Sequence, residues 1–85
     1  MLELYQAEWC PHSHKVRQKL TELGEDFIAR QVPEEPEDRD EMRERTGSDT
    51  IPVAVLDDGT ILDGDAEEIA AELQRRLAPV GGSPS

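Results

Sequence analysis

The chain has 85 residues and a formal net charge of −11, with 20 acidic side chains against 9 lysines and arginines. This charge repels nucleic-acid phosphates and anionic membrane surfaces, and Tyr5, Trp9 and Phe27 are the only aromatic side chains that could stack on bases. We therefore expect no nucleic-acid or membrane partner, and one domain with a modest core.

The compartment is predicted from the cysteine and the N-terminus. Cys10 is the only cysteine, so an internal disulfide cannot form. The segment 1–4 lacks the basic and apolar stretches of a signal peptide, and no apolar run is long enough to span a membrane. These features favour a reducing compartment, and we expect the cytoplasm.

The first half of the chain predicts a strand, a helix and a second strand. Residues 2–5 form a short mixed run typical of a strand. Pro11 suits the first position of a helix, and Gly24 suits its end. Residues 27–32 alternate as a strand does. The helix presents one apolar face, made of Val16, Leu20 and Leu23, and its other face carries Lys15, Arg17, Gln18 and Lys19.

The middle of the chain predicts a loop and a charged helix. Residues 33–36 begin and end with proline, which indicates a loop. Residues 37–46 are strongly charged, with Met42 as the only large apolar side chain, and predict a short, mostly exposed helix that ends at Gly47.

A hairpin and a last helix follow. Residues 51–56 are the clearest strand, residues 57–59 (Asp-Asp-Gly) indicate a tight turn, and residues 60–62 return as the partner strand. Asp65 and Glu68 have the spacing of a capping box. The last helix has one apolar face, made of Ile69, Leu73 and Leu77.

The order β-α-β-α-β-β-α predicts an α/β fold with a four-stranded mixed sheet and helices on both faces. The first two strands are joined through a helix and can run parallel, whereas the last two form a hairpin. We place the domain at residues 1–77 and expect residues 78–85 to be a flexible tail.

Cys10 is the strongest candidate for chemistry. It lies directly before Pro11, at the predicted N-terminus of the first helix, where the helix dipole and free N–H groups favour negative charge. Its thiol should therefore have a lowered pKa and a larger thiolate fraction. A lone cysteine is commonly an inert core residue. A strand-to-helix turn before a proline normally lies at the surface edge of a sheet, which favours the reactive interpretation.

Three segments resemble the glutaredoxin family. Residues 9–13 (Trp-Cys-Pro-His-Ser) resemble its Cys-Pro-Tyr-Cys and Cys-Pro-Tyr-Ser active sites, and residues 49–52 (Asp-Thr-Ile-Pro) resemble its Thr-Val-Pro turn. Residues 63–67 (Asp-Gly-Asp-Ala-Glu) resemble its Gly-Gly-x-Asp segment and the Glu-Ser turn of glutathione-transferase N-terminal domains. Because all three occur in the family's order, the resemblance covers residues 1–77 and implies a thioredoxin-like fold.

The resemblance implies a thiol-disulfide oxidoreductase. Cys10, in a site with Pro11, would attack mixed disulfides between proteins and glutathione, and a second thiol would release the glutathione. Pro52 would be a cis-proline, and the backbone of Ile51 would pair with the ligand. The γ-glutamyl end would meet three residues, namely Asp65, Ala66 and Glu67. The implied partners are glutathionylated or mixed-disulfide proteins, and we expect a monomer.

Simpler interpretations of these residues stay open. Pro52 could be an ordinary trans proline at an edge strand, and Asp65 and Glu67 could serve only to cap their own helix. For Glu67 taken alone, the capping interpretation is favoured.

The chain departs from the family pattern beside Cys10. Ser13 replaces the second cysteine, so only a one-thiol mechanism is open, although a hydroxyl can bond the thiolate. Ser13 could equally be a solvated helix residue. His12 replaces the usual tyrosine and either assists the thiolate or ligand or is an exposed first-turn residue.

Glu8 puts the identity of the small thiol in question. It stands where the family often has a lysine, and its charge should raise the thiol pKa and repel a carboxylate ligand. Arg39, Arg43 and Arg45 could compensate by meeting the ligand's glycine carboxylate, although such a run is more often a solvated helix face. We therefore expect the small-molecule reductant to be glutathione or another low-molecular-weight thiol.

Two other functions compete with the oxidoreductase. One is an iron–sulfur cluster carrier in which two chains each supply Cys10, although the Pro11-His12 pair departs from the Cys-Gly-Phe-Ser of cluster-binding relatives. The other is a redox-inactive thiol-binding module. A metal site of Cys10, His12 and His14 is disfavoured, because the two histidines point to different helix faces.

Overall fold

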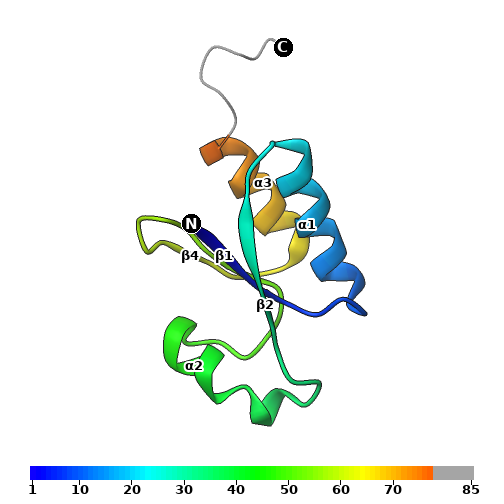
Figure 1. Ribbon diagram of the computed structural model, residues 1–85, viewed down its shortest axis with the longest axis vertical. Helices are drawn as coiled ribbons and strands as arrows, with labels where there is room; N and C mark the ends of the chain where they lie inside the picture. Colours follow the sequence, from blue (N-terminus) through cyan, green and yellow to red (C-terminus); the bar gives the residue numbers. More distant parts are fainter. Residues whose placement is uncertain (78–85) are drawn as a thin grey trace.

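A computed structural model describes residues 1–77 (Figure 1). The predicted tail, residues 78–85, lies outside the described residues. The elements follow in the order β1 (Leu2–Gln6), α1 (Pro11–Glu22), β2 (Phe27–Gln31), the 3-10 turn Pro36–Asp38, α2 (Asp40–Thr46), β3 (Val53–Val55), β4 (Ile61–Leu62) and α3 (Ala66–Leu77).

The strands form one mixed sheet in the order β2-β1-β3-β4. β1 runs parallel to β2, with Leu4 opposite Ala29, and antiparallel to β3, with Leu4 opposite Ala54. β3 and β4 are the antiparallel hairpin. This topology confirms the predicted thioredoxin-like α/β fold.

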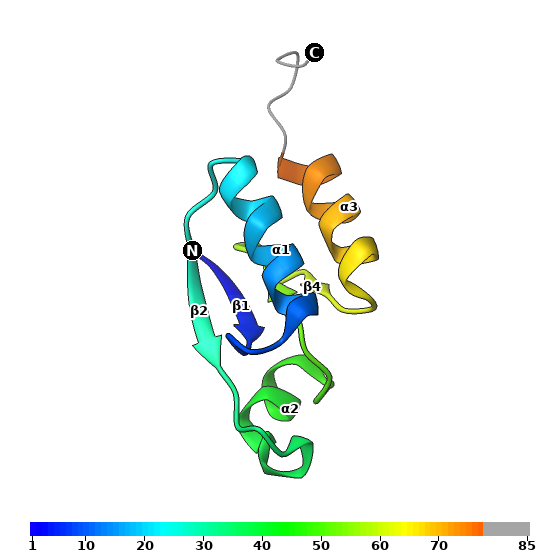
Figure 2. The same ribbon diagram turned by 90° about the vertical axis from the view of Figure 1, so that its right-hand side faces the viewer.

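α1 and α3 pack side by side on one face of the sheet (Figure 2). Their apolar faces meet the inward side chains of β1 and β3, as the spacing of Val16, Leu20 and Leu73 predicts. These three side chains are fully buried. The main core lies between the helix pair and the sheet. It consists of Leu2, Leu4, Val16, Leu20, Ala54, Ala66, Ile69 and Leu73.

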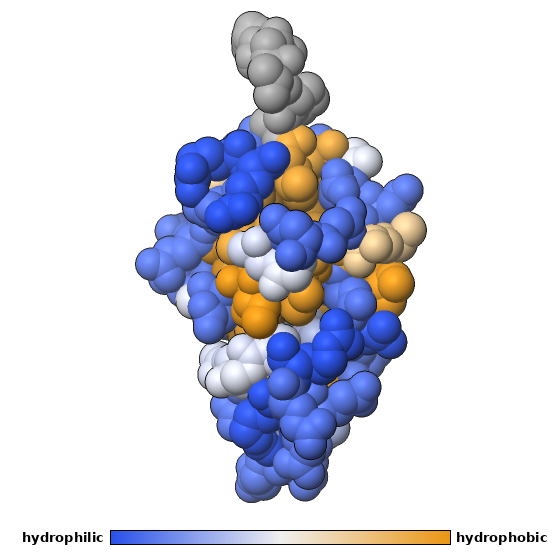
Figure 3. Space-filling view, turned by 90° about the vertical axis from the view of Figure 1, so that its left-hand side faces the viewer, coloured by the Kyte–Doolittle hydropathy of each residue, from blue (hydrophilic) through white to orange (hydrophobic). Residues whose placement is uncertain are grey.

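The opposite face of the sheet carries α2 and a smaller cluster of Tyr5, Met42 and Val53. Helices therefore cover both faces, as predicted, but the short α2 covers only one end of its face. Figure 3 looks onto this side, where apolar side chains show in the middle and the α2 end below them is hydrophilic. Ile28 and Ile61 are among the exposed apolar side chains of the chain.

The predicted helix over residues 37–46 is wrong in its first part. A 3-10 turn, Pro36–Asp38, precedes α2, and Arg39 between them leaves helical geometry with φ −93° and ψ 52°. The Arg39 side chain is drawn inward, where it bonds three backbone carbonyl oxygens. The predicted end is confirmed, because Gly47 closes α2 in the left-handed conformation with φ 77°.

Three strands are shorter than predicted. β3 spans Val53–Val55 rather than residues 51–56, and it starts after Pro52 because proline has no N–H to donate to a neighbouring strand. The bond between Ile51 and Pro52 is cis, as the resemblance implied. β2 ends at Gln31, although the Val32 N–H still donates to the Gln6 carbonyl at 3.2 Å. β4 begins at Ile61 rather than at residue 60.

Within the part of the chain that the structure describes, no helix has both the length and the apolar character needed to cross a membrane.

Candidate functional site

Cys10 is the N-cap of α1, with φ −89° and ψ 117°. Its N–H donates to the Ala7 carbonyl at 3.2 Å, which closes a tight turn after β1, and its carbonyl accepts from the His14 N–H at 3.1 Å. The residue is only 7% exposed, so our expectation of a surface position is wrong. The neighbouring Trp9 is 62% exposed, so the two adjacent residues of the turn differ in burial.

The surroundings of Cys10 favour its thiolate. Burial raises the pKa of the thiol and is the largest single influence. Hydrogen bonds from the Ser13 N–H, the Ser13 hydroxyl and the His12 N–H lower the pKa, as does the positive charge of Arg17. Together they outweigh burial, so the pKa of Cys10 lies below that of an ordinary thiol. The lowered thiol pKa that we predicted from the position of Cys10 at a helix N-terminus is confirmed.

Ser13 is fully buried, which contradicts the solvated interpretation of this residue. Its Oγ accepts a hydrogen bond from the Ala7 N–H at 3.4 Å. The hydroxyl therefore holds the turn on one side and faces the Cys10 sulfur on the other.

Glu8 does not have the effect that its charge alone predicts. Its Oε1 lies 3.6 Å from Nη2 of Arg17, and its side chain is 73% exposed to solvent. The pKa of Cys10 is lowered despite this carboxylate. Arg17, which we placed on the polar face of the helix, is turned toward the end of β1 and is only partly exposed.

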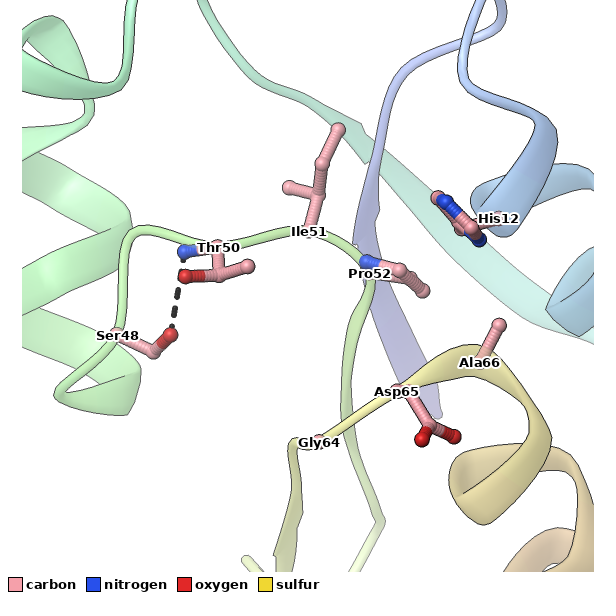
Figure 4. Close-up of a pocket in the computed structure, with 8 residues that line it drawn as sticks. All are labelled: His12, Ser48, Thr50, Ile51, Pro52, Gly64, Asp65 and Ala66. Atoms are coloured by element: carbon pink, nitrogen blue, oxygen red, sulfur yellow. Dashed lines mark hydrogen bonds between the residues drawn. The ribbon is translucent and has the colours of Figure 1, made fainter.

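A pocket of about 430 Å³ opens beside the start of α1 (Figure 4). It is enclosed by α1, the segment before β3 and the start of α3. The lining residues are His12, Ser48, Thr50, Ile51, Pro52, Gly64, Asp65 and Ala66. Figure 4 shows the His12 ring on one side, with Pro52 and Ala66 facing it.

Local hydrogen bonds shape the pocket walls. The Ser48 hydroxyl accepts from the Thr50 N–H at 3.2 Å, which turns the chain toward Ile51 and the cis Pro52. The capping box predicted for α3 is confirmed, because Glu68 N–H donates to Asp65 Oδ1 at 2.8 Å and Asp65 N–H donates to Glu68 Oε1 at 3.1 Å. The Asp65 carboxylate thus caps its own helix while lining the pocket.

The structure brings together only part of the predicted site. His12, Ile51, Pro52, Asp65 and Ala66 line the pocket. Cys10 and Pro11 do not line it, and they precede His12 along the chain. Glu67 does not line it either. Its side chain is 84% exposed and lies 3.9 Å from Nζ of Lys15.

The three arginines of the charged segment also lie outside the pocket lining. Arg39 is buried, and its Nε, Nη1 and Nη2 donate to the carbonyls of Pro33, Asp49 and Glu34 at 2.8, 2.8 and 3.0 Å. Arg43 bonds Asp40 and Asp49. Arg45 lies 3.3 Å from Glu3, over the ring of Tyr5. The side chains thus bind the protein itself.

The sequence did not indicate the roles that four residues of this region have in the structure. Ser48 and Thr50 line the pocket, and only their position just before the proline turn could have indicated them. Arg17 lies four residues after Ser13, on the same side of a helix, which is a usable signal. Arg39 gives no local signal, because its partners are backbone carbonyls.

Within residues 1–77, histidine, cysteine, aspartate and glutamate side chains do not gather in a group of three that could hold a metal ion.

Solved structures with a similar fold include glutathione transferases. A diazinon-metabolizing glutathione S-transferase of the silkworm Bombyx mori is 26% identical with a TM-score of 0.78, covering 99% of this chain and 40% of that one. One from Rhodospirillum rubrum F11 is 26% identical with a TM-score of 0.75, covering 99% and 39%. One from Methylobacillus flagellatus KT, with glutathione bound, is 26% identical with a TM-score of 0.72, covering 89% and 37%.

The chain thus spans about two fifths of the length of these transferases. No curated protein sequence matches it. The glutaredoxin family model matches residues 2–61, which include Cys10, the cis Pro52 and all four strands up to the first residue of β4. This match covers more than half of the chain, and its fold is the thioredoxin-like fold described above. The chain therefore belongs to the glutaredoxin family.

Proposed function

We propose that the protein is a one-thiol oxidoreductase that reduces mixed disulfides between proteins and glutathione or a similar low-molecular-weight thiol. The observation that carries this proposal is the environment of Cys10. A single thiol with a lowered pKa stands at the N-terminus of α1, two residues before His12, which lines a pocket. Thiols at helix N-termini and beside positive charges have lowered pKa values and are reactive, whereas thiols in purely apolar surroundings have raised pKa values and are inert.

The reaction has two thiol-disulfide exchanges. The Cys10 thiolate attacks the sulfur of the small thiol in the mixed disulfide, the S–S bond breaks, and the substrate protein leaves as a thiolate that takes a proton from water. Cys10 is then disulfide-bonded to the small thiol. A second molecule of that thiol, as its thiolate, attacks the small-thiol sulfur and releases Cys10 together with the oxidised small thiol.

The pocket offers complementary groups for a peptide-like thiol. The first N–H groups of α3, beside Ala66, can receive a carboxylate, since helix N-termini favour anions. The backbone of Ile51 can pair with an extended ligand in the manner of an added strand. His12 is the lining side chain that can carry a positive charge. The glutathione-bound transferase of M. flagellatus, which shares the fold, supports glutathione as the first candidate.

The test is turnover of a glutathionylated peptide, followed by mass spectrometry, with glutathione as reductant. Wild-type protein should release the peptide thiol and pass through a glutathione adduct on Cys10. Cys10→Ser should abolish both signals, and Arg75→Gln, on the exposed end of α3, should retain them. Full turnover by Cys10→Ser would contradict the proposal.

The Ser13→Ala variant tests whether the Ser13 hydroxyl only lowers the pKa of Cys10 or also takes part in the reaction. No resolving thiol is lost, so we expect most activity to remain at alkaline pH, where the thiol ionises without help. At lower pH the activity should fall, because the Ser13 hydroxyl helps to lower the pKa of Cys10. Complete inactivity at every pH would mean that the hydroxyl takes part in the chemistry itself.

The purified wild-type and Cys10→Ser proteins also distinguish the oxidoreductase from a cluster carrier and from a redox-inactive module. Brown, dimeric protein with visible absorbance that Cys10→Ser removes would replace the oxidoreductase with a cluster carrier. Colourless protein that binds glutathione without forming an adduct would replace it with a redox-inactive module.

A further inference from the structure

We propose that Arg17 is a positioning residue that holds the turn carrying Cys10 and offsets the charge of Glu8. The inference deepens the proposed function, because it concerns the same thiol. Arg17 lies on α1, one turn beyond Ser13, and its side chain is 19% exposed. It belongs neither to the pocket lining nor to the residues of the Cys-Pro-His-Ser segment.

The guanidinium contacts three consecutive residues that lead from β1 toward Cys10. Nη1 donates to Oε1 of Gln6 and to the carbonyl of Ala7, the latter at 3.5 Å. Nη2 lies 3.6 Å from Oε1 of Glu8. A planar fork with several donors can bind three acceptors at once, which a lysine ammonium does less rigidly.

The Ala7 carbonyl joins Arg17 to the reactive residue. This one oxygen accepts from Nη1 of Arg17 and from the N–H of Cys10, at 3.5 and 3.2 Å. On the other side, the Ala7 N–H donates to Ser13 Oγ. Ala7 is therefore held from α1 through both of its backbone polar groups, and its carbonyl contacts both Arg17 and Cys10.

Gln6 supports the same arrangement from within the core. The residue is fully buried, and among residues 1–77 its Nε2 has no acceptor. Its anchored polar atom is Oε1, which receives the Arg17 donor. A buried amide held by one cation stabilises the orientation of both groups, since leaving the oxygen unpaired would carry a desolvation penalty.

The charges around the Cys10 thiol explain why the contacts of Arg17 affect the reactivity of that thiol. The ionisable groups on the segments around Cys10 are Glu8 in the turn and His12, His14, Lys15 and Arg17 in α1, whereas Asp65 caps α3 and Asp49 is bonded by Arg43. Glu8 is the acidic group nearest to Cys10 in sequence. Paired with Arg17, it presents a nearly neutral unit to the thiolate, whereas unpaired it would oppose ionisation.

The experiment measures the pH dependence of Cys10 alkylation by iodoacetamide in four proteins: wild type, Arg17→Gln, Arg17→Lys and Arg75→Gln. In Arg17→Gln the Cys10 pKa should rise by about half a unit to one unit, which slows alkylation about three- to tenfold at pH values below the pKa. Arg17→Lys should lie between wild type and Arg17→Gln, because it keeps the charge but not the fork. Arg75→Gln should match wild type.

An unchanged pKa in folded Arg17→Gln would overturn the proposal, and so would wild-type behaviour in Arg17→Lys, since charge alone would then suffice. Glu8→Gln keeps the test decisive if Arg17→Gln does not fold. Because Arg17 already neutralises Glu8, this variant should shift the pKa by less than about 0.3 unit. A fall of about one unit would show that Glu8 acts on the thiol uncompensated, which contradicts the proposal.

Alkylation does not require thiol transfer, so this test is separate from that of the proposed function. Wild-type protein that alkylates readily but releases no peptide thiol would refute the oxidoreductase while leaving the role of Arg17 to be decided by the variants.

Discussion

The two faces of the sheet are stabilised in different ways. On the α1/α3 face, apolar side chains from both helices and from β1 and β3 make a continuous core. On the α2 face, three buried side chains form a small cluster, and arginines bound to carbonyls and carboxylates complete the packing. The comparison teaches that apolar packing fixes α1, the helix whose N-cap is Cys10, whereas charged hydrogen bonds, such as that of Arg39 to the Asp49 carbonyl, fix the segment that leads to the cis Pro52.

The largest expected effect lies on the apolar face. Leu73 is completely buried between α3 and the sheet, so Leu73→Ala should lower the free energy of unfolding by about 3 kcal/mol, measured by urea denaturation. Leu77→Ala is the matched control, because that side chain only flanks the core at the end of the same helix and should cost about 1 kcal/mol. Equal losses for the two variants would contradict the assigned core.

A smaller effect, with a different signature, is expected on the other face. Arg39→Gln removes charged bonds to the carbonyls of Pro33, Glu34 and Asp49, and should lower the free energy of unfolding by about 2 kcal/mol. Because Asp49 leads into the pocket wall, KM for the mixed disulfide should rise while the rate of Cys10 alkylation stays constant. A changed alkylation rate with an unchanged KM would mean that Arg39 supports the Cys10 side instead.

The smallest effect concerns the ion pairs of Glu3 with Arg30 and Arg45, at 3.1 and 3.3 Å. The hydrogen bond from Arg30 is the largest influence on the Glu3 carboxyl, and its pKa lies below the usual value. A depressed pKa contributes stability above the unfolded-state value, and that stability is lost as the pH falls through the folded-state value. The difference between wild type and Glu3→Gln should therefore be largest near neutral pH and should shrink below about pH 4.5. A difference that grows in acid would contradict the pairing.

Local signals predicted much of the fold and part of the site. The Pro11 start of α1, the Asp65–Glu68 capping box and the hairpin turn depend on neighbouring residues, so the sequence alone indicates them. The burial of Cys10 could not be predicted from neighbouring residues alone, because it results from the Ala7–Cys10 turn and its hydrogen bond to Ser13. The inward Arg39 was equally hidden in a charged run, since its acceptors are carbonyls from two separate loops.

The position of the site at one end of the sheet follows from the order and direction of the strands. Cys10 comes after β1 and Pro52 comes before β3, and these two strands are adjacent and antiparallel. The end of the first and the start of the second therefore lie at the same edge of the sheet. Resemblance to the family suggested this pairing, whereas the roles of Ser13 and Arg17 required the side-chain contacts.

The central claim is that Cys10 is an activated thiolate, and its pKa in the wild-type protein tests this most directly. The measurement is the pH dependence of the ultraviolet thiolate absorbance, with Cys10→Ser as the blank. We predict a single transition with a midpoint clearly below about 8.5, the value of a free cysteine, because the donors from Ser13 and His12 outweigh burial. A midpoint at or above that value would mean that burial prevails, and would contradict the account of Cys10 as the nucleophile.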